Sequence, residues 1–418
     1  MKSTQIKVYL FNLLVILLMI ASSSCSSQPI DDPGMAATYA FNSALLTATY
    51  ALSMELATQV TDTPNIVDVQ TITETPLPPT PTIVRTPPDL PQMFTSAYLN
   101  PLDVPHTYIN DVCQYLKLKW DPNNSAPGTI VMPIMFHNIT DDTEKLKQPN
   151  YIHPDEVKQM LRDLHDQGFE TISMEQLKNF LLLNAKIPSR SVMLIVDDRH
   201  YAESYETHFK PSLDEYGWSV VTNAWISTPD STADLVAGNV RIDQEGWVDH
   251  QAHGVIHNIP ISNWQSGTII YNDMTAEQFI HNELFGSITY IENTYGHKPV
   301  AYIWPGGGFT EYSINVAKEA GYYLGFTVNP RGPIMFNWIP LSDNVDPMRP
   351  SYIPEGTMSD ILMVLPRYWD VSARSNIDVV RQIGKAAAQY ASDNAQIELD
   401  YYDIVCREIT GEIPAAVE

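Results

Sequence analysis

Residues 191–200 read Ser-Val-Met-Leu-Ile-Val-Asp-Asp-Arg-His, and this stretch decides the fold. A short aliphatic run that ends abruptly at polar residues is typical of a strand buried in a parallel sheet. Two adjacent carboxylates, Asp197 and Asp198, end this run. A carboxylate at the end of a buried strand needs partners or a metal ion to offset the loss of water. The stretch therefore predicts a core strand that carries two acidic side chains into a functional site.

Strand patterns and helix patterns alternate between residues 129 and 394. This alternation is typical of βα units and predicts an α/β fold with a mostly parallel sheet. Periodicity alone does not distinguish a barrel from an open doubly wound sheet. We expect strands at residues 129–137, 191–196, 218–226, 300–304, 324–328 and 361–365, and helices at residues 151–168, 174–185, 201–216, 275–294, 312–320 and 374–394.

A histidine cluster follows at residues 250–257, which read His-Gln-Ala-His-Gly-Val-Ile-His. Two histidines four positions apart, His253 and His257, can project from one side of a helical turn or tight loop and reach one ion. A carboxylate oxygen with two imidazole nitrogens suits Zn²⁺, or the similar ions Co²⁺ and Ni²⁺, with one coordination position left open. We therefore expect a divalent metal site and regard His250 as a neighbour of it.

A third stretch, residues 301–308, reads Ala-Tyr-Ile-Trp-Pro-Gly-Gly-Gly and precedes a helix that ends in Ala-Lys-Glu-Ala-Gly-Tyr at residues 317–322. With the Asp pair and the His pair, in this order, it resembles the polysaccharide deacetylases with a NodB homology domain (carbohydrate esterase family 4). The resemblance runs from about Thr129 to about Asp370. It looks closer to the branch that acts on extracellular poly-N-acetylglucosamine. It implies a distorted, incomplete (β/α) barrel of about seven strands.

The resemblance also implies roles for individual residues. Asp198, His253 and His257 would bind the metal, which polarises an acetyl carbonyl and acidifies a bound water. Asp197 would be the general base, because the metal keeps its neighbour ionised and engaged. The backbone N–H of Gly306 would help to stabilise the oxyanion of the tetrahedral intermediate.

Three further residues are expected to contact the substrate. His137 ends the first strand, and Trp304 and Pro305 belong to the third stretch. For His137, packing is as good an explanation as a place in the substrate pocket, and for Trp304 core packing is as good an explanation as stacking on a sugar ring.

The chain departs from the family pattern around the Asp pair and in the third stretch. Ile195-Val196 replaces the usual Thr-Phe, and Arg199 replaces a glycine. Ile303 stands where the family commonly has an arginine, so the third stretch offers no group to orient Asp197.

A further departure concerns the general acid, which in the family is a late histidine. This sequence has no histidine after His297. Arg367 lies in roughly that region, and it could stabilise charge or orient Asp197, but a guanidinium does not readily donate a proton. Protonation of the leaving group would then need water, His137 or His200.

The composition is strongly acidic, with 24 Lys+Arg against 49 Asp+Glu and a formal net charge of -25. Nucleic-acid binding rewards clustered basic residues, so the charge argues against that class of partner. It fits a soluble extracytoplasmic enzyme that acts on a neutral or basic substrate, although solubility alone would explain it as well. We expect a polysaccharide substrate and a monomer.

The N-terminus predicts export. A basic start is followed by an apolar run at residues 8–21, which is short for a membrane span and suits a signal peptide ending near residue 24. Cys25 follows small residues and resembles the lipid-bearing cysteine of a bacterial lipoprotein, with an ordinary signal peptide as the alternative. We therefore expect a cell-surface protein, either anchored through this lipid or secreted.

The remaining segments suggest a spacer and an extension in front of the catalytic domain. Residues 25–95 are of low complexity, with a helix expected at 35–61 and a Thr/Pro-rich, polyproline-like part after it. Residues 96–128 form an extension that packs on the domain at residues 129–410. Cys113 and Cys406 invite one disulfide in an oxidising compartment, and two buried thiols are the alternative.

The sequence therefore predicts a metal-dependent hydrolase that removes N-acetyl groups from N-acetylglucosamine-containing polysaccharide. An esterase that removes O-acetyl groups from glycan is the nearest enzymatic alternative. A barrel that binds carbohydrate without catalysis is the alternative from another class.

Overall fold

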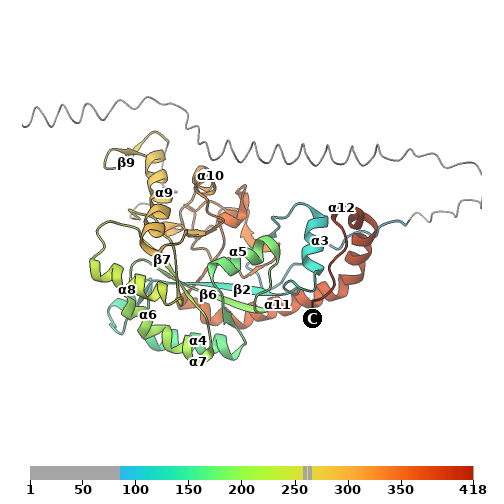
Figure 1. The fold of residues 1–418 in the computed structure, drawn as a ribbon, viewed down its shortest axis with the longest axis horizontal. Coiled ribbons are helices and arrows are strands. Elements are labelled where there is room, and N and C mark those ends of the chain that lie inside the picture. The colour runs from blue at the N-terminus through green and yellow to red at the C-terminus, as the bar shows by residue number, and fades with distance from the viewer. Residues whose placement is uncertain (1–84, 258–260, 262–265, 418) are drawn as a thin grey trace, which may run out of the picture. The chain divides into compact units, whose positions relative to one another are not determined.

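The computed structural model describes residues 85–257, 261 and 266–417, and Figure 1 shows their arrangement. The predicted signal peptide, Cys25 and the predicted helix at residues 35–61 lie outside the described residues. Within the described part of the chain, no helix is long and apolar enough to cross a membrane.

Six strands that pair in parallel form the centre of the domain. They are β2 (Ile130–Phe136), β6 (Arg190–Asp197), β7 (Val221–Trp225), β8 (Val248–Ala252), β11 (Ala301–Ile303) and β12 (Leu324–Phe326). Their order across the curled sheet is β12-β11-β8-β7-β6-β2. Nearly all their residues are buried, as expected for parallel strands that are covered on both faces.

The sheet is closed by residues 361–369, for which the prediction from the sequence was wrong. The expected strand at residues 361–365 is instead a short 3₁₀ turn, η5 (Ile361–Met363), followed by a bridge between Leu365 and Phe326 of β12. Strand β15 (Tyr368–Trp369) then pairs in parallel with β2 at the opposite edge of the sheet. Residues 365–369 therefore join both edges and complete a distorted seven-stranded barrel. Pro366 lacks an N–H, which explains why no continuous strand forms here.

Shorter strands extend the central sheet or form separate two-stranded pairs. β5 (Glu170–Thr171) extends β6 in parallel, and β13 (Ile334–Met335) pairs antiparallel with β2. The other short strands form three pairs: β1 (Asp103–His106) with β14 (Ile339–Ser342), β3 (Asn138–Ile139) with β4 (Tyr151–Ile152), and β9 (Ile269–Tyr271) with β10 (Met274–Thr275).

Helices cover the outside of the barrel (Figure 1). They are α4 (Pro154–Asp166), α5 (Met174–Leu183), α6 (Ala202–His208), α7 (Lys210–Tyr216), α8 (Ala233–Gln244), α9 (Ala276–Tyr295), α10 (Glu311–Ala320) and α11 (Asp370–Tyr401), with α3 (Val112–Trp120) in the extension and α12 (Arg407–Thr410) at the end. Local signals set several ends: α9 begins with a capping box formed by Thr275 and Gln278 and ends at Gly296, which is left-handed.

Three helices differ from the expectation. The predicted helix at residues 201–216 is two helices joined at Phe209, because Pro211 in the first turn of α7 cannot donate to the preceding turn. Helix α8 was not predicted. Helix α11 is longer than residues 374–394, since it begins directly after β15.

A disulfide joins the extension to the end of the chain. Cys113 of α3 is bonded to Cys406, 293 positions away, which is the pairing expected from the sequence. Around the bond, Leu116 and Tyr402 complete a small buried cluster that is separate from the two core clusters of the barrel. Strand β1 adds a second attachment through its pairing with β14.

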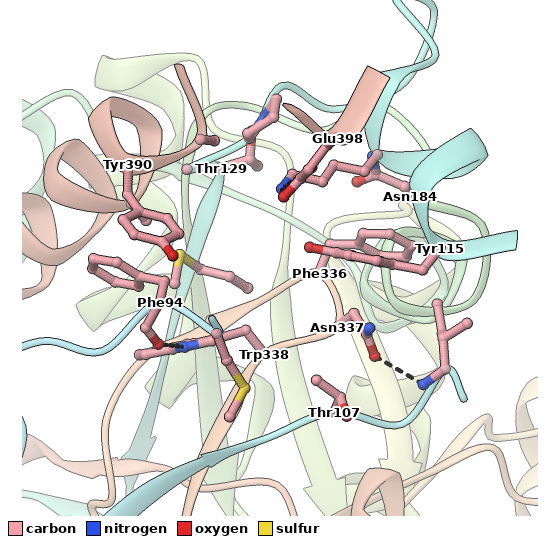
Figure 2. Close-up of a pocket in the computed structure, with 18 of the residues that line it drawn as sticks. Phe94, Thr107, Tyr115, Thr129, Asn184, Phe336, Asn337, Trp338, Tyr390 and Glu398 are labelled. Atoms are coloured by element: carbon pink, nitrogen blue, oxygen red, sulfur yellow. Dashed lines mark hydrogen bonds and ion pairs between the residues drawn. The ribbon is translucent and has the colours of Figure 1, made fainter. Parts of the chain in front are cut away.

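The extension and α11 enclose a cavity of about 290 Å³ away from the barrel mouth. Figure 2 shows its aromatic walls, which come from Phe94, Tyr115, Phe336, Trp338 and Tyr390. Glu398 lies at its edge and accepts hydrogen bonds from Lys119 at 2.7 Å and from Trp120 at 2.7 Å. The cavity is therefore lined in part by α3, the helix that carries Cys113 of the disulfide.

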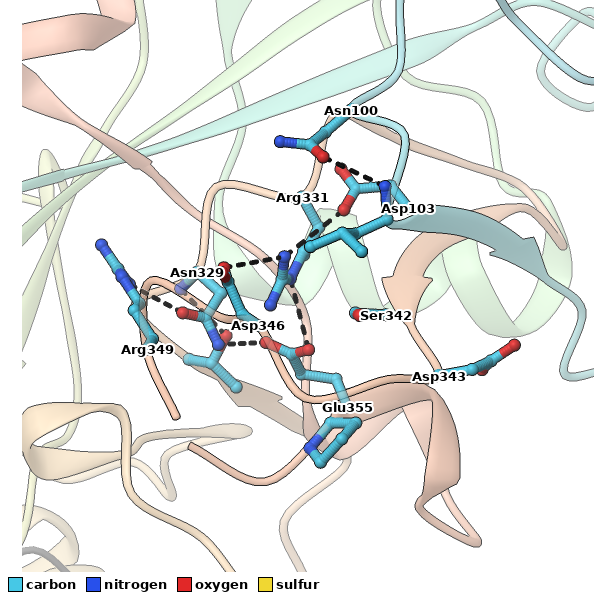
Figure 3. A network of polar contacts seen from close by, with 12 residues as sticks. Asn100, Asp103, Asn329, Arg331, Ser342, Asp343, Asp346, Arg349 and Glu355 are labelled. Carbon is cyan, nitrogen blue, oxygen red and sulfur yellow. Dashed lines mark hydrogen bonds and ion pairs between the residues drawn. The ribbon is translucent and has the colours of Figure 1, made fainter. Parts of the chain in front are cut away.

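A buried arginine ties the extension to the loops after β12 and β14. Arg331 is 6% exposed and faces three carboxylates, those of Asp103, Asp346 and Glu355, at 3.5, 3.5 and 3.3 Å (Figure 3). One guanidinium therefore faces three acidic side chains, one from the extension and two from the loop after β14.

Candidate metal centre and active site

The Asp pair lies where β6 leaves the barrel. Asp197 is the last residue of β6 and is 1% exposed, while Asp198 is partly exposed. Asp198 has a left-handed backbone, with φ of 73°. This conformation, uncommon outside glycine, breaks the strand alternation, so the two neighbouring side chains meet different partners at the same edge of the barrel.

Asp198 meets the two histidines of the predicted metal site. Its Oδ1 lies 3.4 Å from Nε2 of His257 and 3.9 Å from Nε2 of His253, and the two Nε2 atoms are 3.0 Å apart. One ligand atom from each residue falls within 4.8 Å of the others, and this is the one such group of three or more His, Cys, Asp or Glu in the described part of the chain. One carboxylate and two imidazoles form a donor set that suits a divalent ion such as Zn²⁺.

The tautomer of His253 also suits a metal. Its Nδ1–H donates to the carbonyl of Ile303 at 2.8 Å, which leaves the Nε2 lone pair pointing toward Asp198 and His257. Burial lowers the pKa of His253 to about 4 against the opposing effect of Asp197, so the imidazole is neutral at neutral pH. Neutral imidazole is the form that binds metals.

Asp197 is held by Arg367 across the barrel. Nη1 of Arg367 donates to Oδ1 of Asp197 at 2.6 Å, and its Nε donates to the carbonyl of Thr327 at 2.8 Å. Burial alone would raise the pKa of Asp197, but Arg367, His253 and His137 outweigh it and lower the pKa to about 2. Asp197 is therefore ionised at neutral pH. Arg367 orients its carboxylate, a role for which the third stretch offers no group because residue 303 is isoleucine.

His137 is the histidine that faces the free oxygen of Asp197. It follows β2, and its Nε2 lies 3.7 Å from Oδ2 of Asp197. Its ring stacks against Trp369, with centroids 6.1 Å apart. Its Nδ1 and Oδ2 of Asp370 are both buried without a hydrogen-bond partner among the described residues, and burial raises the pKa of the Asp370 carboxyl.

His200 is aimed elsewhere. Its Nε2 lies 3.0 Å from the backbone carbonyl of Asp197, and burial lowers its pKa. Of the two histidines considered as proton donors from the sequence, His137 is thus the one whose ring faces the Asp197 carboxylate.

The structure corrects the expected substrate contacts of two residues in the third stretch. The ring of Trp304 is fully buried and its Nε1–H donates to the carbonyl of Met363 at 2.7 Å, so the expected sugar contact is wrong: this ring packs in the core. Pro305 is also buried, and a Cβ placed on Gly254 would lie 3.4 Å from its Cγ, so it packs against the histidine-bearing loop rather than offering a surface to a sugar. Gly306 is exposed at the turn that follows, with φ of 59°, and its carbonyl accepts from Tyr352 at 3.2 Å.

One residue of the site was missed from the sequence. Glu283 of α9 is fully buried and accepts hydrogen bonds from the backbone of the loop that carries His257. The helical spacing in the sequence could have identified this residue. Glu283 lies at i+7 from Ala276 and i+4 from Phe279, on the apolar face of the helix. A glutamate on that face needs a buried partner.

Comparison with known proteins finds a family that matches the part of the chain that carries this site. Residues 184–325, which include the Asp pair, the His pair and the third stretch, match the family model of polysaccharide deacetylases. This region is therefore similar to the polysaccharide deacetylase family. The resemblance predicted from the three stretches is therefore confirmed.

The polysaccharide deacetylase region has curated relatives at low identity. The chain is 21% identical over 199 residues to YxkH of Bacillus subtilis, which is provisionally named a polysaccharide deacetylase. This match covers 48% of this chain and 65% of that protein. It is 20% identical over 234 residues to the poly-β-1,6-N-acetyl-D-glucosamine N-deacetylase of Escherichia coli, covering 48% of this chain and 34% of that protein. The chain thus spans less than two thirds of the length of each relative.

Solved structures with a similar course of the chain include the following two. The deacetylase PplD of Streptococcus pyogenes, solved with acetate, has a TM-score of 0.46 and 20% identity, covering 60% of this chain and 98% of that one. IcaB of Ammonifex degensii has a TM-score of 0.43 and 13% identity, covering 62% of this chain and 97% of that one.

Proposed function

We propose that this protein is a metal-dependent deacetylase that hydrolyses the N-acetyl groups of N-acetylglucosamine-containing polysaccharide at the cell surface. The observation that carries the proposal is the juxtaposition of two acidic groups at one strand end. Asp198 lies against His253 and His257, while its neighbour Asp197 is held by Arg367. This arrangement supports Asp198 as a metal ligand and Asp197 as the group that moves a proton.

The donor set defines what a bound ion would contribute. A divalent ion held by Asp198, His253 and His257 would polarise the acetyl carbonyl and lower the pKa of a water molecule. The proton transfers would be carried out by side chains of this chain. Asp197 has one oxygen, Oδ1, occupied by Arg367, so Oδ2 is the atom that takes the proton of the attacking water.

The leaving amine needs a proton, and the position of His137 supports it as the donor. Its Nε2 faces Oδ2 of Asp197 at 3.7 Å, so base and acid flank the same small volume. Its stacking on Trp369 fixes the ring orientation. This arrangement supports His137 as the general acid in a sequence that has no later histidine than His297.

Two further features support the same reaction. The turn at Gly306 begins directly after β11, beside the carbonyl of Ile303 that orients His253. A backbone N–H at this turn would stabilise the negative charge on the acetyl oxygen. Export agrees with an extracellular polysaccharide: we keep the signal peptide at residues 1–24, with Cys25 as a lipid-bearing residue, as part of the proposal.

The test is acetate release from N-acetylglucosamine oligomers by the purified protein, with Zn²⁺ or Co²⁺ and with a chelator. We expect release that the chelator abolishes and that added metal restores. The variant Asp197→Asn should bind the same amount of metal and release no acetate. Metal binding without acetate release, but with release from O-acetylated glycan, would assign the site to ester hydrolysis instead, and binding of glycan without either release would leave a non-catalytic barrel.

A further inference from the structure

The second histidine of the candidate metal site lies on a loop in which one buried carboxylate accepts hydrogen bonds from three successive backbone N–H groups. We call residues 254–257 the histidine loop. Glu283 of α9 accepts hydrogen bonds from three of its N–H groups: Val255 to Oε2 at 3.1 Å, Ile256 to Oε1 at 2.8 Å and His257 to Oε2 at 3.1 Å. Both carboxylate oxygens of a side chain with no solvent exposure are thereby used on one short loop.

We propose that Glu283 is a positioning residue of the metal centre, which fixes the histidine loop so that the imidazole of His257 meets Asp198 and His253. The proposal rests on the metal-dependent function proposed above and adds to it a residue outside the ligand set. Glu283 touches no ligand side chain in this role: it acts through the backbone of the residue that carries the ligand.

The three ligands differ in what holds their backbones. Asp198 directly follows β6, and His253 continues the β7–β8 pairing, because its N–H donates to the carbonyl of Trp225 at 2.9 Å. His257 lies beyond the strand, with a left-handed φ of 66° that a non-glycine residue rarely adopts. Its N–H is one of the three that Glu283 accepts. Loss of the Glu283 carboxylate should therefore release His257 and leave the other two ligands in place.

The histidine loop and α9 approach each other closely, and the Glu283 carboxylate fills the space beside Gly254. A Cβ on Gly254, whose φ is 82°, would lie 2.4 Å from Oε2 of Glu283. A Cβ on Gly286, one turn further along α9, would lie 3.0 Å from Cγ2 of Val255. Residue 254 is glycine, so the Glu283 carboxylate occupies space that a side chain at this position would need.

The experiment measures metal binding by the full-length protein, with Zn²⁺ and Co²⁺ themselves as the probes. Glu283→Gln keeps the size of the side chain but removes its charge and turns one acceptor into an NH₂ group that faces a backbone N–H. We expect this variant to bind Zn²⁺ about 10–100-fold more weakly, as is typical when a residue that orients a ligand is lost. We also expect a changed visible spectrum of bound Co²⁺, which reports the ligand geometry, and faster hydrogen exchange at Val255, Ile256 and His257.

A matched control lies on the same helix. Glu277 also accepts a loop N–H, that of Gly267 at 3.2 Å, but it serves a segment outside the metal site. Glu277→Gln should keep wild-type affinity and the wild-type Co²⁺ spectrum. Gly254→Ala should reproduce the Glu283→Gln result, because the added methyl group displaces the same carboxylate.

The outcomes separate this inference from the proposed function. If the wild-type protein binds neither ion, the metal-dependent function fails and this inference falls with it. If the wild-type protein binds metal and Glu283→Gln binds it with the same affinity and spectrum, the function stands and the role of Glu283 is refuted. If both variants fail to fold by circular dichroism while Glu277→Gln folds, Glu283 supports the barrel as a whole and the specific assignment to the histidine loop is wrong.

Discussion

Arg367 and Asp197 are 170 positions apart in the chain, yet Nη1 of Arg367 donates to Oδ1 of Asp197 at 2.6 Å inside the barrel. The guanidinium is itself fixed by the hydrogen bond from its Nε to the Thr327 carbonyl. Arg367 belongs to the segment that joins the two edges of the sheet, between the Leu365 bridge and β15. Barrel closure and orientation of the Asp197 carboxylate are therefore accomplished by the same few residues.

The first prediction concerns this pair. Arg367→Met should lower kcat by at least about 100-fold, because Asp197 loses the donor that fixes its Oδ1 and its ionised state. Zn²⁺ binding should persist, since Asp198, His253 and His257 keep their positions. Acetate release and metal content measured on the same preparation check both statements.

The free energy of unfolding of the Arg367 variants is the control for this prediction. A buried carboxylate left without its partner costs roughly 3–5 kcal/mol, so Arg367→Met should also unfold at lower denaturant. Arg367→Lys keeps the charge but has a single point of attachment, and it should recover part of the stability and part of kcat. Wild-type kcat in a folded Arg367→Met protein would contradict the role given to this arginine.

The second prediction separates acid catalysis by His137 from packing. His137→Gln should slow hydrolysis of an N-acetyl group by about 100-fold or more, because an amine is a poor leaving group without a proton. The same variant should hydrolyse 4-nitrophenyl acetate nearly as fast as the wild type, because nitrophenolate leaves unprotonated. The ratio of the two rates is the measurement.

His200→Gln is the matched control for this test. His200 is also near Asp197, but its Nε2 interacts with the backbone carbonyl rather than with the carboxylate. Its substitution should change both substrates alike. If His137→Gln slowed amide and activated ester by the same factor, His137 would be a packing residue.

The parts of the site that lie on single strands could be predicted from the sequence. The Asp pair ends an apolar run, and the two histidines have a spacing that lets both reach one ion, so the local pattern was sufficient. The α/β class followed in the same way from alternation. These features depend on neighbours in the chain, and a single sequence records such neighbours directly.

The parts that depend on long-range contacts could not be predicted in the same way. The closure at residues 365–369 follows from pairing with β12 and β2, which are distant in the sequence. In the sequence, Trp304 beside Pro305 suggests an aromatic ring that stacks on a sugar. In the structure, this ring is buried and donates to the Met363 carbonyl, a contact with a segment distant in the sequence. Glu283 could be noticed on an apolar helix face, but its partner loop is revealed only by the fold.

The third prediction concerns the disulfide. Cys113→Ser with Cys406→Ser should lower the free energy of unfolding by about 3–5 kcal/mol, because the bond closes a very long loop in the unfolded chain. Metal binding and acetate release should be unchanged at 25 °C, since the bond lies in a cluster separate from the barrel core. Denaturant unfolding of the oxidised and reduced protein checks the first statement, and a loss of metal affinity in the folded double variant would contradict the second.

The last prediction comes from the Arg331 network, in which Asp103 occupies an unfavourable position. Both of its carboxylate oxygens are buried without a hydrogen-bond partner among the described residues, and Arg331 lies 3.5 Å away (Figure 3). Burial raises the pKa of Asp103 from 3.8 to about 7, and Glu355 and Asp346 add to this, while Arg331 opposes it. The folded protein therefore holds a proton on Asp103 over a pH range in which the unfolded chain has lost it.

The sign of the pH effect follows from this difference. Stability from the protonated carboxyl is fully present below pH 3.8 and is lost as the pH rises through about 7. Asp103→Asn imitates the protonated form, so it should remove this loss and be more stable than the wild type at pH 8, by on the order of 1–4 kcal/mol, with a smaller difference at pH 5. Urea unfolding at the two pH values measures this difference, with Asp89→Asn, at an exposed position before the extension, as the control. Parallel stability curves for Asp103→Asn and the wild type between pH 5 and 8 would show that Asp103 is already ionised in the fold and that Arg331 fully compensates its burial.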